Sequence, residues 1–227
     1  MMTPDYGETF ALWRKGAAGR WHDYTHHSFV EKLGDGTLPR SAFLHYLIQD
    51  YVFLVHFSRA WSLAVVKSET LEEMKICAGT VDALVNHEMS LHVRTCAAEG
   101  IDEATLFAAQ EAVENLAYTR YVMDAGLQGD FLDLMAALMP CVMGYGEIGL
   151  RLAHNMADDT PYATWIATYA APDYQAVCAD VGAMIDNSVA RRIGKLSQSP
   201  RAAALQSRFS TATNLEVGFW NMGLNGA

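Results

Sequence analysis

Three side chains that could do chemistry stand in otherwise apolar, helix-like stretches of this sequence: Asp50, Cys141 and Glu216. In each stretch the apolar residues recur at alternating steps of four and three, which is the spacing of one face of an α-helix. That face is expected to pack into the core, where a carboxylate or a thiol is costly to bury without a partner or a task. We therefore expect an acid, a nucleophile and a hydrogen-bonding carboxylate to converge inside a helical bundle.

The two carboxylates suit different tasks. Asp50 has no Lys or Arg within one helical turn, so its partner must come from another element. A carboxylate in an apolar slot could hold an amino-substituted heterocycle through two hydrogen bonds. Glu216 has apolar neighbours that should raise its pKa, so that it could donate a proton near neutral pH, with Phe219 as part of the pocket wall. The alternative for each is a structural ion pair between helices.

Cys141 has a neighbourhood that favours reactivity. Pro140 should bend the helix beside the thiol, and Tyr145 stands one turn further on the same face. Glycines after the thiol should leave room for a neighbour or a ligand; they are Gly144, Gly146 and Gly149. The alternative is that Cys141 is a small buried hydrophobe, which we expect of the other three cysteines.

Aromatic and histidine residues add weaker indications. Tyrosines and a tryptophan at helical spacing suit the core, and their density also suits a slot for a flat heterocycle; they are Tyr118, Tyr121, Trp165 and Tyr169. His87 and His92 are five residues apart, so they would diverge by ~140° around a helix and do not form a zinc motif. The chain has no Glu-x-x-His motif, which di-iron bundles use, so we expect no metal. A haem ligand among His22, His26 and His27 stays open.

Composition narrows the class of protein. The 227 residues are 51% hydrophobic and 19% charged, which is typical of a globular chain, and the formal net charge of -10 argues against nucleic acid and anionic membrane surfaces. No uninterrupted apolar run reaches the ~18 residues of a membrane span, and the start of the chain has no secretory signal pattern. Four scattered cysteines without a C-x-x-C pair indicate reduced thiols. A cytoplasmic protein is expected.

The elements that must position these residues are helices. Strand and hairpin signals are almost absent, and short breakers separate long helical patterns. Thr70 followed by Glu73 predicts a capping box, Gly100 a left-handed helix end, and Pro161 and Pro172 first helical positions. The predicted helices cover 4–25, 37–67, 70–99, 103–125, 130–156, 161–170, 173–193 and 199–223. With no linker or repeat, residues 1–227 are predicted to form a single all-α domain packed as a helical bundle.

Motifs spread over nearly the whole length resemble those of one family. They are His27–Val30, Gly34–Pro39, Tyr46–Tyr51, Glu88–His92, the Pro140–Cys141 helix and Glu216–Trp220. Together they are similar to the TenA family, the thiaminase II or aminopyrimidine aminohydrolase enzymes. This resemblance implies a haem-oxygenase-like fold, a small pyrimidine as substrate, no cofactor, and a homotetramer.

The resemblance also implies roles for individual residues. Cys141 matches the family's nucleophile and Glu216 its proton donor. The positions that bind the pyrimidine are matched by Asp50, Tyr145 and Tyr169, with Tyr118 as a further pocket tyrosine. The implied reaction releases 4-amino-5-hydroxymethyl-2-methylpyrimidine from the 5-aminomethyl compound, and from thiamin, by addition of Cys141 to the ring, in thiamin salvage.

One residue departs from the family pattern. Many members have a tyrosine thought to sharpen the thiol, where this chain has Phe53. We expect the Phe53 ring to lie beside Asp50 on the pocket side of its helix. The missing hydroxyl is the support for an alternative, a non-catalytic pyrimidine-binding or regulatory module. A metal-dependent oxidase on the same fold is a further alternative, which the missing histidines disfavour.

Overall fold

The computed structural model describes residues 4–226, apart from the side chain of Leu91, and within that range it contains helices and no β-strand. The N-terminal Met1–Thr3, on which our expectation of no secretory signal partly rests, lies outside the described residues. The helices are α1 (Glu8–Gly16), α2 (Ala18–Thr25), α3 (Ser28–Asp35), α4 (Arg40–Lys67), α5 (Leu71–Asp82), the π-helical η1 (Ala83–Glu88), α6 (Met89–Ala98), α7 (Glu103–Phe107), α8 (Val113–Gln128), α9 (Phe131–Asn155), α10 (Ala163–Ala170), α11 (Pro172–Ile193), the 3₁₀ turn η2 (Leu196–Gln198) and α12 (Ala202–Asn225).

Several helix boundaries follow from local chemistry that the sequence predicts. Thr70 and Glu73 form the reciprocal capping box at the start of α5, and Pro172 is the first residue of α11. Gly100, just after α6, has a φ of 80°, the left-handed conformation that glycine adopts at low cost. The predicted helix ends are confirmed at these positions.

The N-terminal prediction is wrong in detail. Instead of one helix over 4–25, α1 begins at Glu8 and ends at Gly16, and α2 follows after Ala17. A third short helix, α3, was not predicted; His27 caps it by accepting a hydrogen bond from the Phe29 amide at its Nδ1. These helices are eight or nine residues long, too short for hydrophobic periodicity alone to mark their ends.

Tertiary contacts also split the helix predicted over 103–125. It ends after five residues in α7, and α8 begins only at Val113. The intervening loop is held by the buried amide of Gln49 on α4, which donates to the Gln110 carbonyl and accepts from the Ala112 amide, both at 2.9 Å. Likewise α10 begins at Ala163 and not at Pro161, because the Thr160 hydroxyl caps this turn and bonds to the Leu33 carbonyl.

The helix predicted over 70–99 is continuous but not regular. Between α5 and α6 the six residues of η1 are π-helical. A π-helical segment inserts an extra residue per turn and is frequently found at functional sites. Here the π-helical segment ends at Glu88, and His92 follows four residues later on α6.

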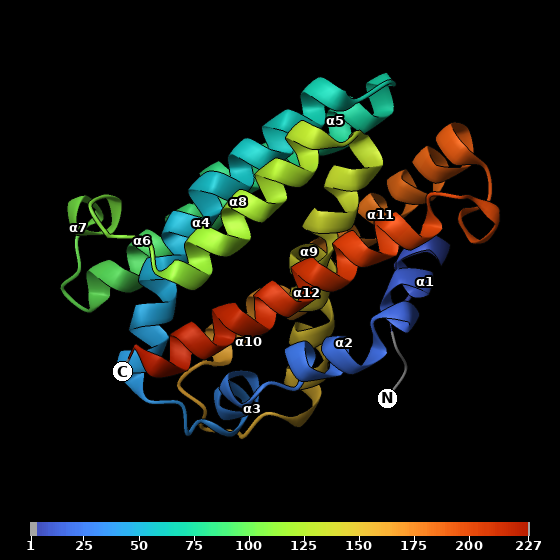
Figure 1. The fold of residues 1–227 in the computed structure, drawn as a ribbon. Helices are drawn as coiled ribbons and strands as arrows, with labels where there is room; N and C mark the ends of the chain where they lie inside the picture. The colour runs from blue at the N-terminus through green and yellow to red at the C-terminus, as the bar shows by residue number, and fades with distance from the viewer. Residues whose placement is uncertain (1–3, 227) are drawn as a thin grey trace.

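The arrangement places α9 at the centre of the molecule. In Figure 1, α4, α5 and α8 run side by side, and α12 crosses in front of α9, with which it packs. α9 is also in contact with α10 and α11, and the buried hydrophobic residues from Tyr6 to Met222 form one connected core. By length and composition α9 could cross a membrane, although it contains no uninterrupted apolar run of ~18 residues. Because 94% of its most apolar window is buried inside the bundle, it is explained as a core helix.

Candidate active site

A cavity of about 510 Å³ lies beside α9 and gathers residues from distant parts of the chain. Its walls come from α4, α5, η1, α9, α10 and α11, together with Arg94 of α6. Five of the residues singled out in the sequence line it: Asp50, Phe53, Cys141, Tyr145 and Tyr169. The predicted convergence of a carboxylate and a thiol on one site is therefore seen in the structure.

The partner of Asp50 is His92 of α6. The His92 Nε2 lies 2.6 Å from Asp50 Oδ2, and both side chains are buried. The His92 Nδ1 lies 3.0 Å from the Glu88 carbonyl, which can only accept a hydrogen bond. With an ionised Asp50 as the acceptor at Nε2, both ring nitrogens donate and the ring is an imidazolium. Its pKa is raised to about 9 by the hydrogen bond and charge of Asp50, although burial opposes the shift.

The second oxygen of Asp50 is left for a ligand. Oδ2 accepts from His92 and, at 3.1 Å, from the Tyr46 hydroxyl, whereas Oδ1 accepts no hydrogen bond from the described residues. Tyr46 in turn accepts from the indole of Trp165 at 3.3 Å and lies 3.3 Å from the Tyr145 hydroxyl. This network fixes the orientation of Asp50, so one carboxylate oxygen is held in place at the cavity wall.

Cys141 is half-buried and reaches the cavity from the middle of α9. Burial raises the pKa of its thiol well above its ordinary value, and the carboxylates of Glu216 and Glu88 raise it further. The glycines that follow do admit neighbours. A Cβ on Gly144 would lie 2.2 Å from the Tyr24 ring, and one on Gly149 would lie 2.5 Å from the backbone of Tyr169. The close approach of α10, which brings Tyr169 to the cavity, depends on Gly149.

Glu216 lies outside the cavity lining but is electrostatically coupled to Cys141. It is 1% exposed, and burial raises its pKa to about 8. The Tyr118 hydroxyl donates to its Oε1 at 2.8 Å. As predicted for Glu216, an apolar environment keeps a carboxyl group protonated near neutral pH. Tyr118 is the hydrogen-bond partner of that carboxyl and, like Glu216, is not part of the cavity wall.

Two aromatic expectations have different outcomes. Phe53 does line the cavity with Asp50, and its ring centroid lies 5.1 Å from those of Phe57 and Tyr118. Phe219, expected in the wall, is not among the lining residues. It packs behind Phe53 at a centroid distance of 5.4 Å and against Tyr46 at 6.1 Å. One turn of helix separates it from Glu216, which is itself behind the wall.

Sequence reasoning missed three residues of the site. His92 and Glu88 were considered only as metal ligands or family motif residues, and Tyr46 only as part of a motif. His92 and Glu88 are four residues apart, so they share a helix face. An unpaired Asp50 on one helix and this acid–histidine pair on another could have suggested the contact, but nothing in the spacing identifies which helices touch.

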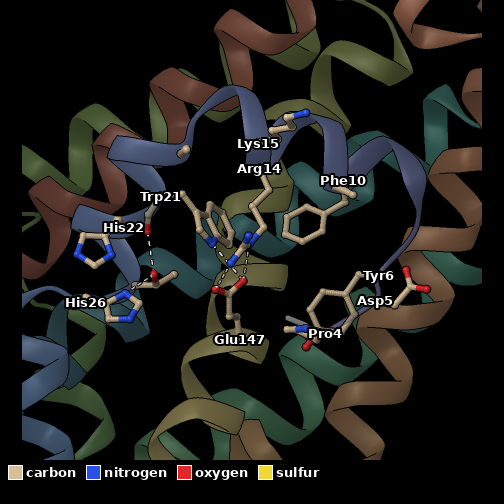
Figure 2. Close-up of a pocket in the computed structure, with 13 residues that line it drawn as sticks. Pro4, Asp5, Tyr6, Phe10, Arg14, Lys15, Trp21, His22, His26 and Glu147 are labelled. Carbon is tan, nitrogen blue, oxygen red and sulfur yellow. Dashed lines mark hydrogen bonds and ion pairs between the residues drawn. The ribbon is translucent and has the colours of Figure 1, made fainter. Parts of the chain in front are cut away.

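A second cavity, of about 530 Å³, opens between α1, α2 and α9 and is lined by none of the predicted site residues (Figure 2). Its buried carboxylate, Glu147, is fully engaged: Arg14 donates two hydrogen bonds at 2.7 and 2.8 Å, and the Trp21 indole donates a third at 3.1 Å. Such a bidentate pair is a strong structural tie between α1 and α9. The rings of His22 and His26 stack nearby with centroids 4.4 Å apart.

Within residues 4–226, no group of three or more His, Cys, Asp or Glu side chains is arranged to hold a metal ion. The three other cysteines, Cys77, Cys96 and Cys178, are buried and free.

The fold defines the class of protein. A helical domain of heme oxygenase-like fold from Shewanella denitrificans superposes with a TM-score of 0.70 over 95% of this chain and 92% of its own, at 12% identity. Residues 14–226 match the profile of the TENA/THI-4/PQQC family, and the chain belongs to that family.

Two relatives are considerably more similar. A TenA family transcription regulator from Silicibacter sp. TM1040 is 59% identical, with a TM-score of 0.95 over 99% of each chain. The aminopyrimidine aminohydrolase of Halalkalibacterium halodurans is 33% identical over 90% of each chain.

The environment of the thiol generates a prediction about Phe53. A hydroxyl in place of the ring's para hydrogen could donate to the sulfur and stabilise the thiolate, so Phe53→Tyr should lower the pKa of Cys141. The measurement is the rate of Cys141 alkylation as a function of pH. One hydrogen bond to a charged group should speed alkylation at neutral pH by about 10-fold or more.

The matched control is Phe57→Tyr, one turn further from Asp50 on α4, which should leave the pH profile unchanged. If Phe53→Tyr also leaves the profile unchanged, Phe53 is only a wall residue and our account of its missing hydroxyl is wrong.

Proposed function

We propose that the protein is an aminopyrimidine aminohydrolase that releases 4-amino-5-hydroxymethyl-2-methylpyrimidine from 4-amino-5-aminomethyl-2-methylpyrimidine, in thiamin salvage. The observation that carries this proposal is the cavity that Cys141 and Asp50 line together. Membership of the TENA/THI-4/PQQC family supports it. So does the likeness to the Halalkalibacterium halodurans enzyme.

In this proposal Asp50 and the aromatic rings bind the pyrimidine. The oriented Oδ1 of Asp50 accepts a hydrogen bond from the exocyclic amine, and His92 and Tyr46 keep that oxygen in place. Tyr145 and Tyr169, whose rings meet edge to face with centroids 4.9 Å apart, supply an aromatic wall for the flat heterocycle. The chain's own side chains supply every group that the reaction uses.

The chemical step needs an acid and a nucleophile. Glu216, whose pKa is about 8, is largely protonated near neutral pH and donates its proton to a ring nitrogen once the substrate fills the site beside Cys141. The Cys141 thiol gives its proton to water as its sulfur adds to the electrophilic ring carbon, and the leaving group departs from the 5-methylene with the electron pair of its bond. Water then adds to the methylene, the thiolate is expelled, and the ring nitrogen returns its proton.

The alternative is a regulatory module that binds the pyrimidine without turnover. The relative from Silicibacter carries the description of a transcription regulator, and the missing hydroxyl at Phe53 also favours this alternative. Against it, the net charge of -10 gives no overall attraction to nucleic acid, and a binding module has no need of a cavity-lining thiol. A metal-dependent oxidase would need a cluster of metal ligands, and residues 4–226 contain no such group.

One assay separates these functions. Purified protein is incubated with the 5-aminomethyl pyrimidine, with and without a chelator, and the hydroxymethyl product is measured. We expect turnover that the chelator does not affect. Binding without product would favour the regulatory module, and turnover abolished by the chelator would favour a metal enzyme. We further propose, from the family resemblance, a homotetramer acting in the cytoplasm; the four free cysteines suit a reducing compartment.

Cys141→Ser should abolish turnover and leave the fold intact. Serine is nearly isosteric, but an alcohol is a far poorer nucleophile without an adjacent base. Steady-state kinetics and thermal unfolding of the variant check this, with Cys178→Ser as the control for loss of a thiol in the same region. Substantial activity in Cys141→Ser would remove the cysteine from the role of nucleophile.

Glu216→Gln and Asp50→Asn should separate the acid from the binding carboxylate. Loss of a positioned acid should lower kcat by ~10²- to 10⁴-fold. The wild-type rate should fall as pH rises through about 8, where Glu216 loses its proton, and the glutamine variant should lack this decline. Asp50→Asn should raise KM as well, because it places a donor against the exocyclic amine. An effect of Glu216→Gln on KM alone would contradict the acid role.

A further inference from the structure

The carboxylate of Glu88 lines the cavity but has no part in the mechanism above. It is half-buried at the end of the π-helical η1, and its Oε1 accepts a hydrogen bond from the Tyr169 hydroxyl at 2.8 Å. Its backbone carbonyl accepts from His92, so the same residue helps to orient the partner of Asp50. Both its backbone and its side chain are therefore fixed at the cavity wall.

The Glu88 carboxylate has no cation in direct contact among the described residues, and the nearest one, His92, is paired with Asp50. His92 is bound to Asp50, and Glu216 is largely protonated near neutral pH. His87, Arg94 and Asp173 also line the cavity, but all three are exposed to solvent. Among the described residues, no Lys, Arg or His side chain lies within ion-pair distance of the Glu88 carboxylate. Burial raises the pKa of Glu88, the charge of His92 partly offsets this, and the nearby Asp50 raises the pKa further.

A partly buried carboxylate that lines a cavity and contacts no cation of the protein is suited to bind a cationic group of a ligand. We infer that Glu88 binds the ammonium group on the 5-methylene of the substrate, and thereby selects a leaving group that is a primary amine. This inference rests on the proposed function and identifies the leaving group that the site prefers. The thiazolium of thiamin is also a cation, but its quaternary nitrogen has no N–H to donate. A hydrogen-bonding carboxylate therefore discriminates between the two leaving groups.

The chemical step is consistent with this assignment. The bond between the methylene carbon and the ammonium nitrogen breaks, its electron pair goes to nitrogen, and neutral ammonia leaves. Water adds to the methylene, and the proton it loses is taken up by the ammonia, so that ammonium and the hydroxymethyl compound are the net products. Glu88 holds the amine in its protonated form, which is the better leaving group. When Glu88 pairs with the substrate ammonium, its negative charge is neutralised and no longer raises the pKa of Cys141.

The test is a comparison of two substrates in Glu88→Gln. The amide keeps an acceptor for Tyr169 but removes the charge. We expect kcat/KM for the 5-aminomethyl compound to fall by about 10- to 100-fold, and that for thiamin to change by less than about threefold. Glu72→Gln, which removes one exposed carboxylate from α5, is the matched control and should change neither value. Equal losses for both substrates, or no loss, would overturn the role of Glu88 and leave the proposed function standing.

A binding measurement decides the same point without turnover. In Cys141→Ser, the 5-aminomethyl compound should bind at least ~10-fold more tightly than the hydroxymethyl compound, and Glu88→Gln in that background should remove the difference. Glu88→Asp, which retains the charge, should preserve part of it. Equal affinities in Cys141→Ser would overturn the proposal, even if the wild-type protein turned over neither substrate. Absence of turnover by itself would contradict only the proposed function.

Discussion

The ion pair between Asp50 and His92 is the constraint on which the site depends. Both side chains are buried, so neither helix can move away without exposing an unpaired charge to an apolar interior, at a cost of ~3–5 kcal/mol. The pair fixes α4 against α6, and the Glu88 carbonyl on His92 Nδ1 sets the turn at which α6 leaves the π-helical segment. Because the folded pKa of His92 is about 9, above its ordinary 6.5, this stabilisation is complete below about pH 6.5 and is lost as pH rises through 9.

The pKa of the Cys141 thiol depends on the carboxyl groups around the same cavity. Burial raises the pKa of the Cys141 thiol, and the charges of Glu216, Glu88 and Asp50 raise it further. Only Asp50 has a cation in direct contact. A protonated Glu216 and a cationic substrate bound to Glu88 would remove two negative charges near Cys141, so that the thiolate becomes more stable. In this account the surrounding carboxylates keep the thiol protonated, and substrate binding favours the thiolate, as expected when the reactivity of a cysteine depends on nearby charge.

Hydrophobic periodicity was sufficient to predict an all-α fold, the long helices α4, α9, α11 and α12, and the inward direction of Asp50, Cys141 and Glu216. It was insufficient where tertiary contacts override local propensity. The buried Gln49 amide holds residues 108–112 out of a helix, and the first helices are too short to show a period. The partner of Asp50 lies 42 residues away in sequence, and its identity depends on which helices meet. The spacing also could not predict that Glu216, Tyr118 and Phe219 lie outside the cavity lining. Spacing shows which side of a helix a side chain is on, but not whether that side chain reaches a cavity.

The protonation state of His92 tests this account most directly. Heteronuclear NMR of the imidazole nitrogens can follow His92 as a function of pH, with His92→Gln used to assign its signals. The account predicts a doubly protonated ring at pH 7, with both N–H groups hydrogen-bonded, that titrates near pH 9. A neutral ring at pH 7 would contradict it, because Asp50 would then have no cation to pair with.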